Sequence, residues 1–520
     1  MAKSKASVRS SKDIKEGALA KFSIDKILPQ KYHVTAVIIV IILLYLIFLN
    51  PLYFGGKSFQ AGDIVAMKAA TSYIEKDREG FSLWNPYLFC GMPAYATGTE
   101  FTWFNLIYAG VTTVRNLFTG LFANDYVQWT FYLILLGVTA FFFMRHLTRN
   151  ILVSLFTALA TAFSTGLIVF LFIGHVTKLT SLCMYPLIFL MLLRMQEKIR
   201  LLDFVLLVIA LQIFVQGFHV QIIFYTLFSV GIYFLYYFIR SLVKKDNLLR
   251  NNIVKSAAVF IAASAIAVLI QSDSLTQIYE YTPYSTRGTE GILEKAGGES
   301  AQTESEYYDY HTGWSFSPGE VLTFIVPSYY GFGNSMYKGP LTQGQEVEVN
   351  TYFGQMAFVD VAMYMGVIVF FLGLFAIFTR WKEPFVQFLT ILAGVSLLIS
   401  FGRTFPVIFD LLFYNLPYFD KFRVPSMILV LDQLTFPVLA GLGLMKIISL
   451  RSEPDQKIIK VVKNTAFVFT GIFILSLLLN NAITSWFTER ANAGLPQQIK
   501  ALSEYAAGMF TTDLIMAMFI

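Results

Sequence analysis

Long apolar runs recur along the whole chain, and short polar segments separate most of them. A run of about 20 apolar residues is long enough to cross the hydrocarbon core of a bilayer as a helix. Helices are expected because a backbone in lipid must satisfy its own hydrogen bonds. The runs cover residues 34–49, 126–144, 152–173, 179–193, 201–215, 222–239, 253–270, 361–378, 388–401, 424–448 and 466–479.

These eleven runs predict an all-α polytopic membrane protein with about 11–12 transmembrane helices. A further piece, residues 404–422, resembles a re-entrant segment. The chain stops inside another apolar run, residues 514–520, which is typical of the start of a twelfth span. We therefore expect the sequence to be truncated at its C-terminus.

The charges between the runs alternate as the positive-inside rule demands. Residues 1–33 form a basic tail, and basic residues also follow every second span. This pattern predicts a cytoplasmic N-terminus, a transmembrane domain over 34–520, and two long outer loops at about 51–125 and 271–360. The tail either only sets this orientation or also contacts anionic lipids.

Composition supports the membrane class and excludes others. Hydrophobic residues make up 56% of the chain and charged residues only 14%, whereas soluble domains carry roughly 25% charged residues. The net charge of +6 arises in the loops between spans, so it indicates no nucleic-acid partner. The two cysteines, Cys90 and Cys183, have no metal-ligand spacing.

The first outer loop contains a carboxylate at a distinctive position. Asp63 precedes apolar residues at helical spacing, so residues 64–76 are expected to form an amphipathic helix. Such a helix lies in the headgroup layer and would hold Asp63 at the boundary of water and lipid. An enzyme acting on a lipid head group needs a carboxylate at that depth. The structural alternative is that Asp63 caps the helix N-terminus, a position that Asp favours.

Four segments together resemble the YfhO family of bacterial membrane proteins. They are SLWNPYLFCGMPA at 82–94, SPGEVLTFIVPSYYG at 317–331, YFG at 352–354 and FRVPS at 422–426. That family is similar to GT-C glycosyltransferases. The resemblance implies a GT-C-like fold in the bacterial cytoplasmic membrane and transfer of a sugar from a polyprenyl-phosphate carrier. The acceptor would be an envelope polymer or a lipid on the extracytoplasmic side.

Such a reaction needs one base and a cationic site for the donor phosphate. A positioned carboxylate can take the proton of the acceptor, and Asp63 is the candidate. The leaving group is already a phosphate, so the carboxyl pair of glycoside hydrolases is not required. Arg423 is the first candidate for the phosphate, because arginine binds phosphate through two parallel hydrogen bonds. Its alternative role is an interfacial anchor. Lys178 and Arg287 are further candidates for the phosphate.

Weaker substrate contacts are expected from other polar residues on the outer side. His175 and His219 each end a span there, although a single histidine at such a place is more often a hydrogen-bonded helix end. Asp273 and Glu280 could bind sugar hydroxyls or a divalent cation, but no cluster has a spacing diagnostic of a metal.

Aromatic residues in the outer loops could stack on a sugar ring. Trp84, Tyr87 and Trp314 are the candidates. Their alternative role is the aromatic belt at the membrane surface.

Two other function classes compete with sugar transfer. One is a transporter or flippase for lipid-linked glycans, and the other is a scaffold for envelope assembly. Against transport, the chain has no internal repeat, and Asp432 is almost the only ionisable residue within a span. A scaffold would need no outward-facing polar group of residues.

Overall fold

The fold is almost entirely helical. The computed structural model describes residues 28–77, 83–88, 90–94, 105–120, 122, 124–285 and 304–520. The first half of the chain contains α2 (His33–Phe48), α3 (Asn50–Tyr53), α4 (Gly62–Asp77), α5 (Leu106–Thr119), α6 (Asp125–Thr148), α7 (Ile151–Ala162), α8 (Thr165–Phe172), α9 (Val176–Leu182), α10 (Tyr185–Glu197), α11 (Leu201–Gln216), α12 (Val220–Val243), α13 (Asn247–Ile270) and α14 (Ser272–Tyr281).

The second half adds α16 (Glu304–Thr312), α17 (Val367–Thr379), α18 (Pro384–Ser400), α19 (Pro406–Asn415), α20 (Val430–Ser449), α21 (Gln456–Leu478), α22 (Asn480–Gly494) and α23 (Ser503–Phe519). Strand is confined to two short hairpins in the described residues. They pair β1 (Trp84–Asn85) with β2 (Met92–Pro93), and β3 (Asn334–Lys338) with β4 (Glu346–Asn350).

Seven helices of the described part are long and apolar enough to cross a membrane, or eight if α7 and α8 count as one span bent by 44°. They confirm the expectation of an all-α, membrane-embedded protein. The seven are Gln30–Phe48, Asp125–Thr148, Val176–Glu197, Val220–Val243, Asn247–Ile270, Pro425–Ser449 and Gln456–Leu478.

The number of long helices is lower than the eleven expected spans. Three expected spans correspond to the shorter apolar helices α11, α17 and α18. These have 16, 13 and 17 residues, which at the helical rise gives roughly 20–26 Å, less than the hydrocarbon thickness. The expected span at 361–378 becomes helical only at Val367, after Gly366 with its positive φ of 91°.

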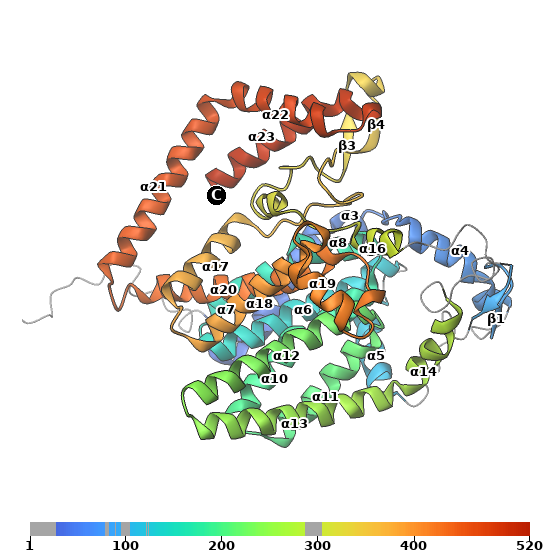
Figure 1. Ribbon diagram of the computed structural model, residues 1–520, viewed down its shortest axis with the longest axis vertical. Helices are drawn as coiled ribbons and strands as arrows, with labels where there is room; N and C mark the ends of the chain where they lie inside the picture. The colour runs from blue at the N-terminus through green and yellow to red at the C-terminus, as the bar shows by residue number, and fades with distance from the viewer. Residues whose placement is uncertain are drawn as a thin grey trace, which may run out of the picture.

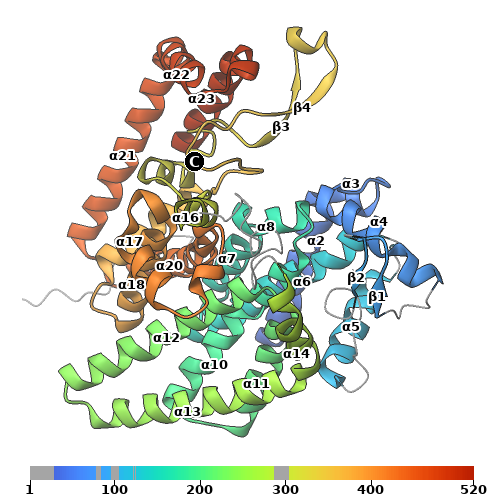
Figure 2. The same cartoon turned by 45° about the vertical axis from the view of Figure 1, so that its right-hand side comes forward.

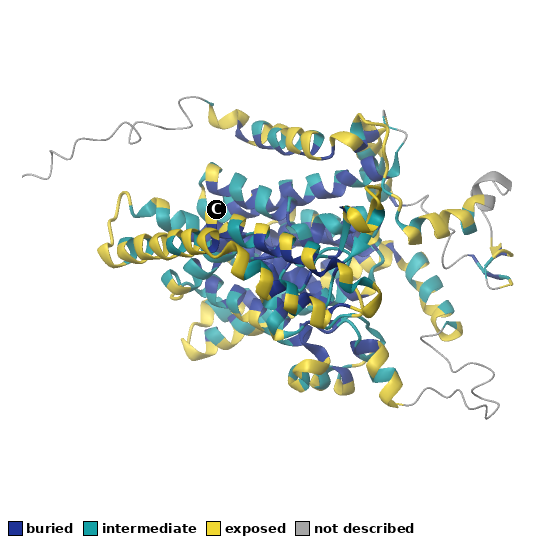
Figure 3. Cartoon of the chain, turned by 90° about the horizontal axis from the view of Figure 1, so that it is seen from above, coloured by how far each residue is buried: buried dark blue, intermediate teal, exposed yellow. Residues whose placement is uncertain are grey.

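Helix α20 lies at the centre of the bundle. Every residue from Val430 to Gly443 is buried, and the helix packs on α7, α17 and α18. Its approach to α17 is very close, because a Cβ at Gly443 would lie 2.2 Å from the carbonyl oxygen of Leu372. Small residues permit such backbone contact between helices in membranes. Figure 3 shows buried residues concentrated in the middle and exposed ones on the outer helices.

Polar contacts gather at two ends of the bundle. At one end, Arg194 bonds Asp203 at 2.6 Å and the Asn252 side chain donates to the carbonyl oxygen of Gln196. At the other end, the Gln221 side chain donates to the carbonyl oxygen of Arg423. Figure 1 shows α4, β1 and α14 on the side away from the turn that joins α12 to α13. The two expected outer loops therefore contain helices and hairpins of their own.

The C-terminal helices form a separate layer. Helix α21 stands apart from the central bundle, and α22 and α23 pack on each other above it (Figures 1 and 2). Phe487 of α22 stacks on Phe510 of α23 with ring centroids 4.1 Å apart. The apolar run that ends the chain is thus part of a helix that already begins at Ser503.

Candidate functional site

Asp63 lies in the first turn of α4, where that helix begins at Gly62. The carbonyl oxygen of Ala61 accepts from the backbone N–H groups of Ile64 and Val65, so Ala61 occupies the capping position. The expected helix at 64–76 is confirmed, but Asp63 does not cap it and makes no side-chain bond to a described backbone N–H. Its side chain is 89% exposed. The positive end of the helix dipole favours a carboxylate at this position.

His175 lies next to Asp63. Its Nε2 atom is 3.9 Å from the Asp63 carboxylate. This contact requires Gly174, which has a φ of 74° and where a Cβ would lie only 2.2 Å from Cγ1 of Ile64. A side chain at position 174 would therefore push α4 away from the turn between α8 and α9. His175 ends the turn before α9 at the capping position, and its carbonyl oxygen accepts from the backbone N–H of Lys178, but its side chain makes no capping bond and its Nδ1 atom is buried without a described partner.

The imidazole of His175 is neutral at physiological pH. Burial lowers its pKa to about 4, and the charge of Lys178 acts in the same direction, whereas Asp63 opposes both. The Asp63–His175 contact is therefore that of a carboxylate with a neutral ring, in spite of its ion-pair distance. A neutral ring can donate a proton in a hydrogen bond through one nitrogen and accept through the other.

Lys178 lies in the first turn of α9 and is only 6% exposed. Its Nζ atom is 4.8 Å from the ring centroid of Phe170. Within the described part of the chain it makes no hydrogen bond, and no carboxylate lies within salt-bridge distance. A buried ammonium group without a close partner is costly. The arrangement is therefore suited to receive an anion from outside the protein.

Asp360 completes the group, and sequence reasoning missed it. Burial raises the pKa of its carboxyl group, as do the charges of Asp63 and Glu348, whereas Lys178 lowers that pKa. Asn334 fixes the residue by donating its backbone N–H to the Asp360 carbonyl oxygen at 2.8 Å. The sequence feature that could have identified Asp360 is its position immediately before the span expected at 361–378, at the end of that span that was expected to face outward. Asp63, His175, Lys178 and Asp360 are called the Asp63 cluster below.

Arg423 lies outside the Asp63 cluster but on the same side of the bundle. Its guanidinium group donates to the Tyr310 hydroxyl at 2.6 Å and stacks on the rings of Tyr310 and Trp314. It forms no ion pair with any described residue. Trp314 donates in turn to the carbonyl oxygen of Phe358, two residues before Asp360. Arg423 and the Asp63 cluster are thus joined through one loop, although they do not touch.

The remaining polar candidates do not join this group. Nδ1 of His219 accepts from the backbone N–H of Ile222 and caps α12, which is the structural role expected for a histidine at a helix end. Asp273 is exposed on α14 and accepts from Gln277 at 3.2 Å. Glu280 is exposed on the same helix. No described contact links Asp273 or Glu280 to the Asp63 cluster.

The aromatic candidates lie in two different places. Trp84 and Tyr87 are exposed in the β1–β2 hairpin, where Trp84 covers Gly91. Trp314 instead stacks with Arg423, as described above. Arg287 lies outside the described residues, as do most of the basic tail and residues 78–82, 95–104 and 286–303 of the expected outer loops.

No metal site is apparent in the described ranges. They contain no group of three or more His, Cys, Asp or Glu side chains that could hold a metal ion. Asp63 and Asp360 come from different segments of the chain. The chemistry available at the Asp63 cluster is that of an exposed carboxylate, a neutral imidazole and a buried cation.

Comparisons with known proteins identified no related protein. No family model, no curated protein and no solved structure matches this chain. The family that the four sequence segments resemble is therefore not established by comparison, and function has to be argued from the geometry of the site.

Proposed function

We propose that this protein is a membrane glycosyltransferase that moves a sugar from a polyprenyl-phosphate carrier to an envelope polymer or a lipid acceptor. One observation carries the proposal: the exposed carboxylate of Asp63 lies within reach of a neutral imidazole and near a buried lysine that lacks a close anionic partner. This reaction requires a base and a cation in one site, and Asp63 and Lys178 both interact electrostatically with His175.

Each residue of the cluster has a role in the proposed reaction. Lys178 binds the donor phosphate and stabilises the negative charge that grows on it as the bond to the sugar breaks. Asp63 takes the proton from the acceptor hydroxyl as that oxygen attacks the anomeric carbon. His175 is a positioning residue, because its neutral ring can donate to the carboxylate and orient it. Arg423 binds a second part of the phosphate-bearing donor.

The proposed orientation follows from the loop charges. The N-terminus lies in the cytoplasm, and the Asp63 cluster lies on the extracytoplasmic side of a bacterial cytoplasmic membrane. Asp63, with an 89% exposed side chain, would then contact an acceptor that arrives from water. Lys178, in the first turn of α9, would contact a phosphate at the lipid surface.

A transporter for lipid-linked glycans is the second candidate, and one observation favours it. Asp432 is buried in the first turn of α20, where its carboxylate accepts from Ser396 at 2.7 Å. Ionisable residues inside a membrane are often part of a transport path. Transport would move the lipid without breaking the bond between sugar and phosphate.

A transfer assay separates the two candidates. The full chain would be reconstituted in nanodiscs with a synthetic polyprenyl-phosphate sugar labelled in the sugar, together with an envelope acceptor extract. Release of unglycosylated polyprenyl phosphate in step with labelled acceptor would support the glycosyltransferase. Donor that stays intact, together with movement of a fluorescent donor between leaflets of proteoliposomes, would instead support the transporter.

A further inference from the structure

The guanidinium group of Arg490 lies among five aromatic rings and makes no hydrogen bond or ion pair with any described residue. Arg490 is on α22, and its Cζ atom is 4.2 Å from the ring centroid of Tyr329 and 4.6 Å from that of Tyr330. Its Nη1 atom is buried without a hydrogen-bond partner. The other three rings, with centroids 5.6–5.9 Å from Cζ, belong to Phe353, Trp486 and Phe487.

These rings hold the cation and join two parts of the chain. The face of an aromatic ring attracts a cation, and the attraction is larger where water is excluded. Two of the rings precede Arg490 on α22 by about one helical turn, whereas the other three come from segment 325–366, which contains the β3–β4 hairpin. Arg490 therefore fastens α22 to that segment. Arg490 and the five rings are called the Arg490 clasp below.

Helix α23 holds the same segment at two further points. The hydroxyl group of Ser328 donates to the carboxylate of Asp513. The hydroxyl group of Tyr505 donates to the carbonyl oxygen of Met336 at 3.2 Å. Because α22 and α23 pack on each other, the clasp and these two bonds attach residues 328–336 to one common support.

The attached residues are bonded in turn to the stretch that ends at Asp360. The backbone N–H of Phe353 donates to the carbonyl oxygen of Tyr330 at 2.9 Å, and that of Asn334 donates to the carbonyl oxygen of Asp360 at 2.8 Å. The two strands of chain approach very closely there, since a Cβ at Gly333 would lie 2.1 Å from the Asp360 carbonyl oxygen. Displacement of residues 330–334 would therefore also displace Asp360.

Segment 328–360 also reaches the second part of the candidate site. The carbonyl oxygen of Phe358 accepts from the indole N–H of Trp314 at 3.2 Å, and Trp314 stacks on Arg423. One segment thus carries Asp360 of the Asp63 cluster and the partner of Trp314. The C-terminal helices fix this segment from the side opposite to the site residues in the sequence, without contributing a side chain to the site.

We propose that Arg490 is a positioning residue for the candidate site. Through its clasp it holds segment 328–360, and with it Asp360 and Phe358, against the bundle. Release of the clasp frees this segment locally and leaves the long helices folded. The inference goes beyond the proposed function and does not depend on it, because it concerns how the site is held and not which reaction occurs there.

Hydrogen–deuterium exchange of the full chain in nanodiscs tests the inference without any sugar transfer. Arg490→Met keeps most of the length of the side chain and removes its charge. Peptides that contain residues 349–361 should exchange about 5- to 30-fold faster in this variant, because the cation no longer attracts the rings. Exchange in α6 and α12 should stay unchanged. Faster exchange in α22 alone, with residues 349–361 unchanged, would overturn the inference.

Two variants on the same helix assign the effect to the cation. Arg490→Lys keeps a positive charge and should loosen residues 349–361 less than Arg490→Met does. Glu489→Met places the same new side chain at the exposed neighbouring position and should leave the exchange of residues 349–361 unchanged. Equal exchange in all three variants would contradict the assignment to Arg490.

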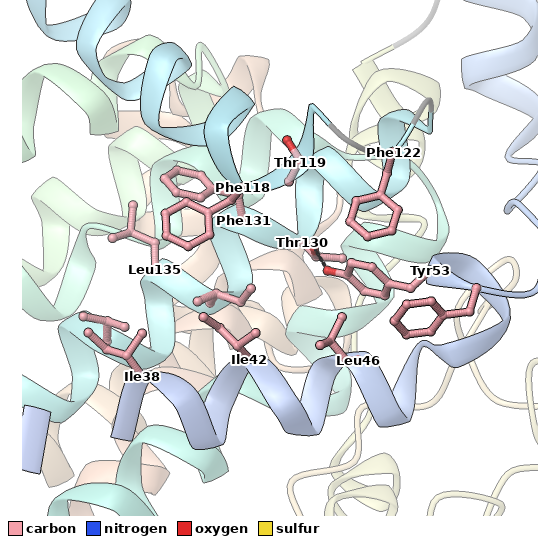
Figure 4. Close-up of a pocket in the computed structure, with 13 residues that line it drawn as sticks. Ile38, Ile42, Leu46, Tyr53, Phe118, Thr119, Phe122, Thr130, Phe131 and Leu135 are labelled. Carbon is pink, nitrogen blue, oxygen red and sulfur yellow. Dashed lines mark hydrogen bonds between the residues drawn. The ribbon is translucent and has the colours of Figure 1, made fainter. Parts of the chain in front are cut away.

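A variant elsewhere in the bundle separates release of the clasp from a general loss of stability. An apolar cavity of about 340 Å³ lies between α2, α5 and α6, and Figure 4 shows Leu135 and Ile38 among its walls. Leu135→Ala enlarges this cavity and should lower the Tm, but it should not speed exchange in residues 349–361. If it loosens them as much as Arg490→Met does, the segment follows global stability and the inference is wrong.

The wild-type protein and a second clasp variant keep the test decisive if Arg490→Met does not fold. Tyr329→Leu removes the nearest ring and should also speed exchange in residues 349–361. In the wild-type protein, these residues and α22 should lose protection at the same urea concentration, since the clasp makes them one unit. Protection of residues 349–361 that persists after α22 has opened would contradict the proposal.

Discussion

The Asp63 carboxylate lies 3.9 Å from Nε2 of His175, and Gly174 makes this contact possible. The two residues come from separate segments, the helix that follows the first span and the turn between α8 and α9. This meeting point defines the candidate site, since Lys178 follows one turn later and Asp360 is held within electrostatic range.

Replacement of Asp63 by asparagine separates catalysis from structure. Because Asp63 is exposed and does not cap α4, we expect Asp63→Asn to lose at most about 1 kcal/mol of stability, from the favourable charge at the helix N-terminus. Sugar transfer should fall about 10²- to 10⁴-fold, because an amide cannot accept the proton. Asp273→Asn, which changes an exposed carboxylate on α14, is the matched control and should retain activity. Near-normal transfer by Asp63→Asn would move the search for the base to Asp360.

Removal of the Lys178 charge should affect binding and stability in opposite directions. Lys178→Met keeps the apolar length of the side chain and removes a buried charge that has no close partner, so the protein should be at least as thermally stable as wild type. The KM for the donor should rise about 10- to 150-fold, since a hydrogen bond to a charged group is lost. A large loss of stability in Lys178→Met would show that the lysine has a structural role instead.

Arg423 and Arg380 test which end of the bundle binds the donor. Arg423→Ala should weaken use of the donor about 30- to 150-fold. Its stability should fall by only about 1 kcal/mol, because the guanidinium group loses ring stacking and an exposed hydrogen bond but no ion pair with a described residue. Arg380 bonds Glu383 through two nitrogens and also the carbonyl oxygen of Leu442. Arg380→Ala should therefore lower stability by about 1–3 kcal/mol and leave the KM for the donor unchanged. Identical donor titrations for the two variants would remove Arg423 from the site.

The buried imidazole of His175 predicts how stability depends on pH. Its pKa falls from 6.5 in the unfolded chain to about 4 in the folded protein, so between these values the unfolded chain binds a proton that the folded protein does not. Stability from this residue is therefore complete above about pH 6.5 and decreases as the pH falls toward 4. Thermal unfolding of His175→Gln should depend less on pH in this window than that of wild type. Parallel curves for the two proteins would contradict this assignment.

Cysteine labelling tests the orientation in the membrane. Lys244 follows α12 at the end with basic loops, and Gly344 lies in the turn between β3 and β4; both positions are exposed. In a background without Cys90 and Cys183, Lys244→Cys should react with an impermeant maleimide only after the membrane is opened, and Gly344→Cys should react in intact cells. Reaction of both from the same side would contradict the proposed topology.

The sequence by itself determined the fold class and most of the long helices. The expected runs at 34–49, 126–144, 222–239 and 253–270 fall within α2, α6, α12 and α13 apart from terminal residues. These helices are readable because a segment in lipid must satisfy its backbone hydrogen bonds within itself and must be apolar along its length. The helix that begins near Asp63 could also be predicted from the sequence, because the spacing of its apolar residues is a local property of the chain.

Tertiary structure decided the breaks in the helices and the membership of the site. The segment expected as one span at 152–173 is two helices, and the span expected from 361 begins only at Val367. In both segments, packing of the chain against α20 and against neighbouring loops competes with continuation of the helix. The length of an apolar run in the sequence does not indicate where packing interrupts a helix. Likewise, no local pattern could place Asp360 near Lys178 or His175 beside Asp63, because each contact joins segments far apart in the chain and depends on a close backbone approach such as the one at Gly174.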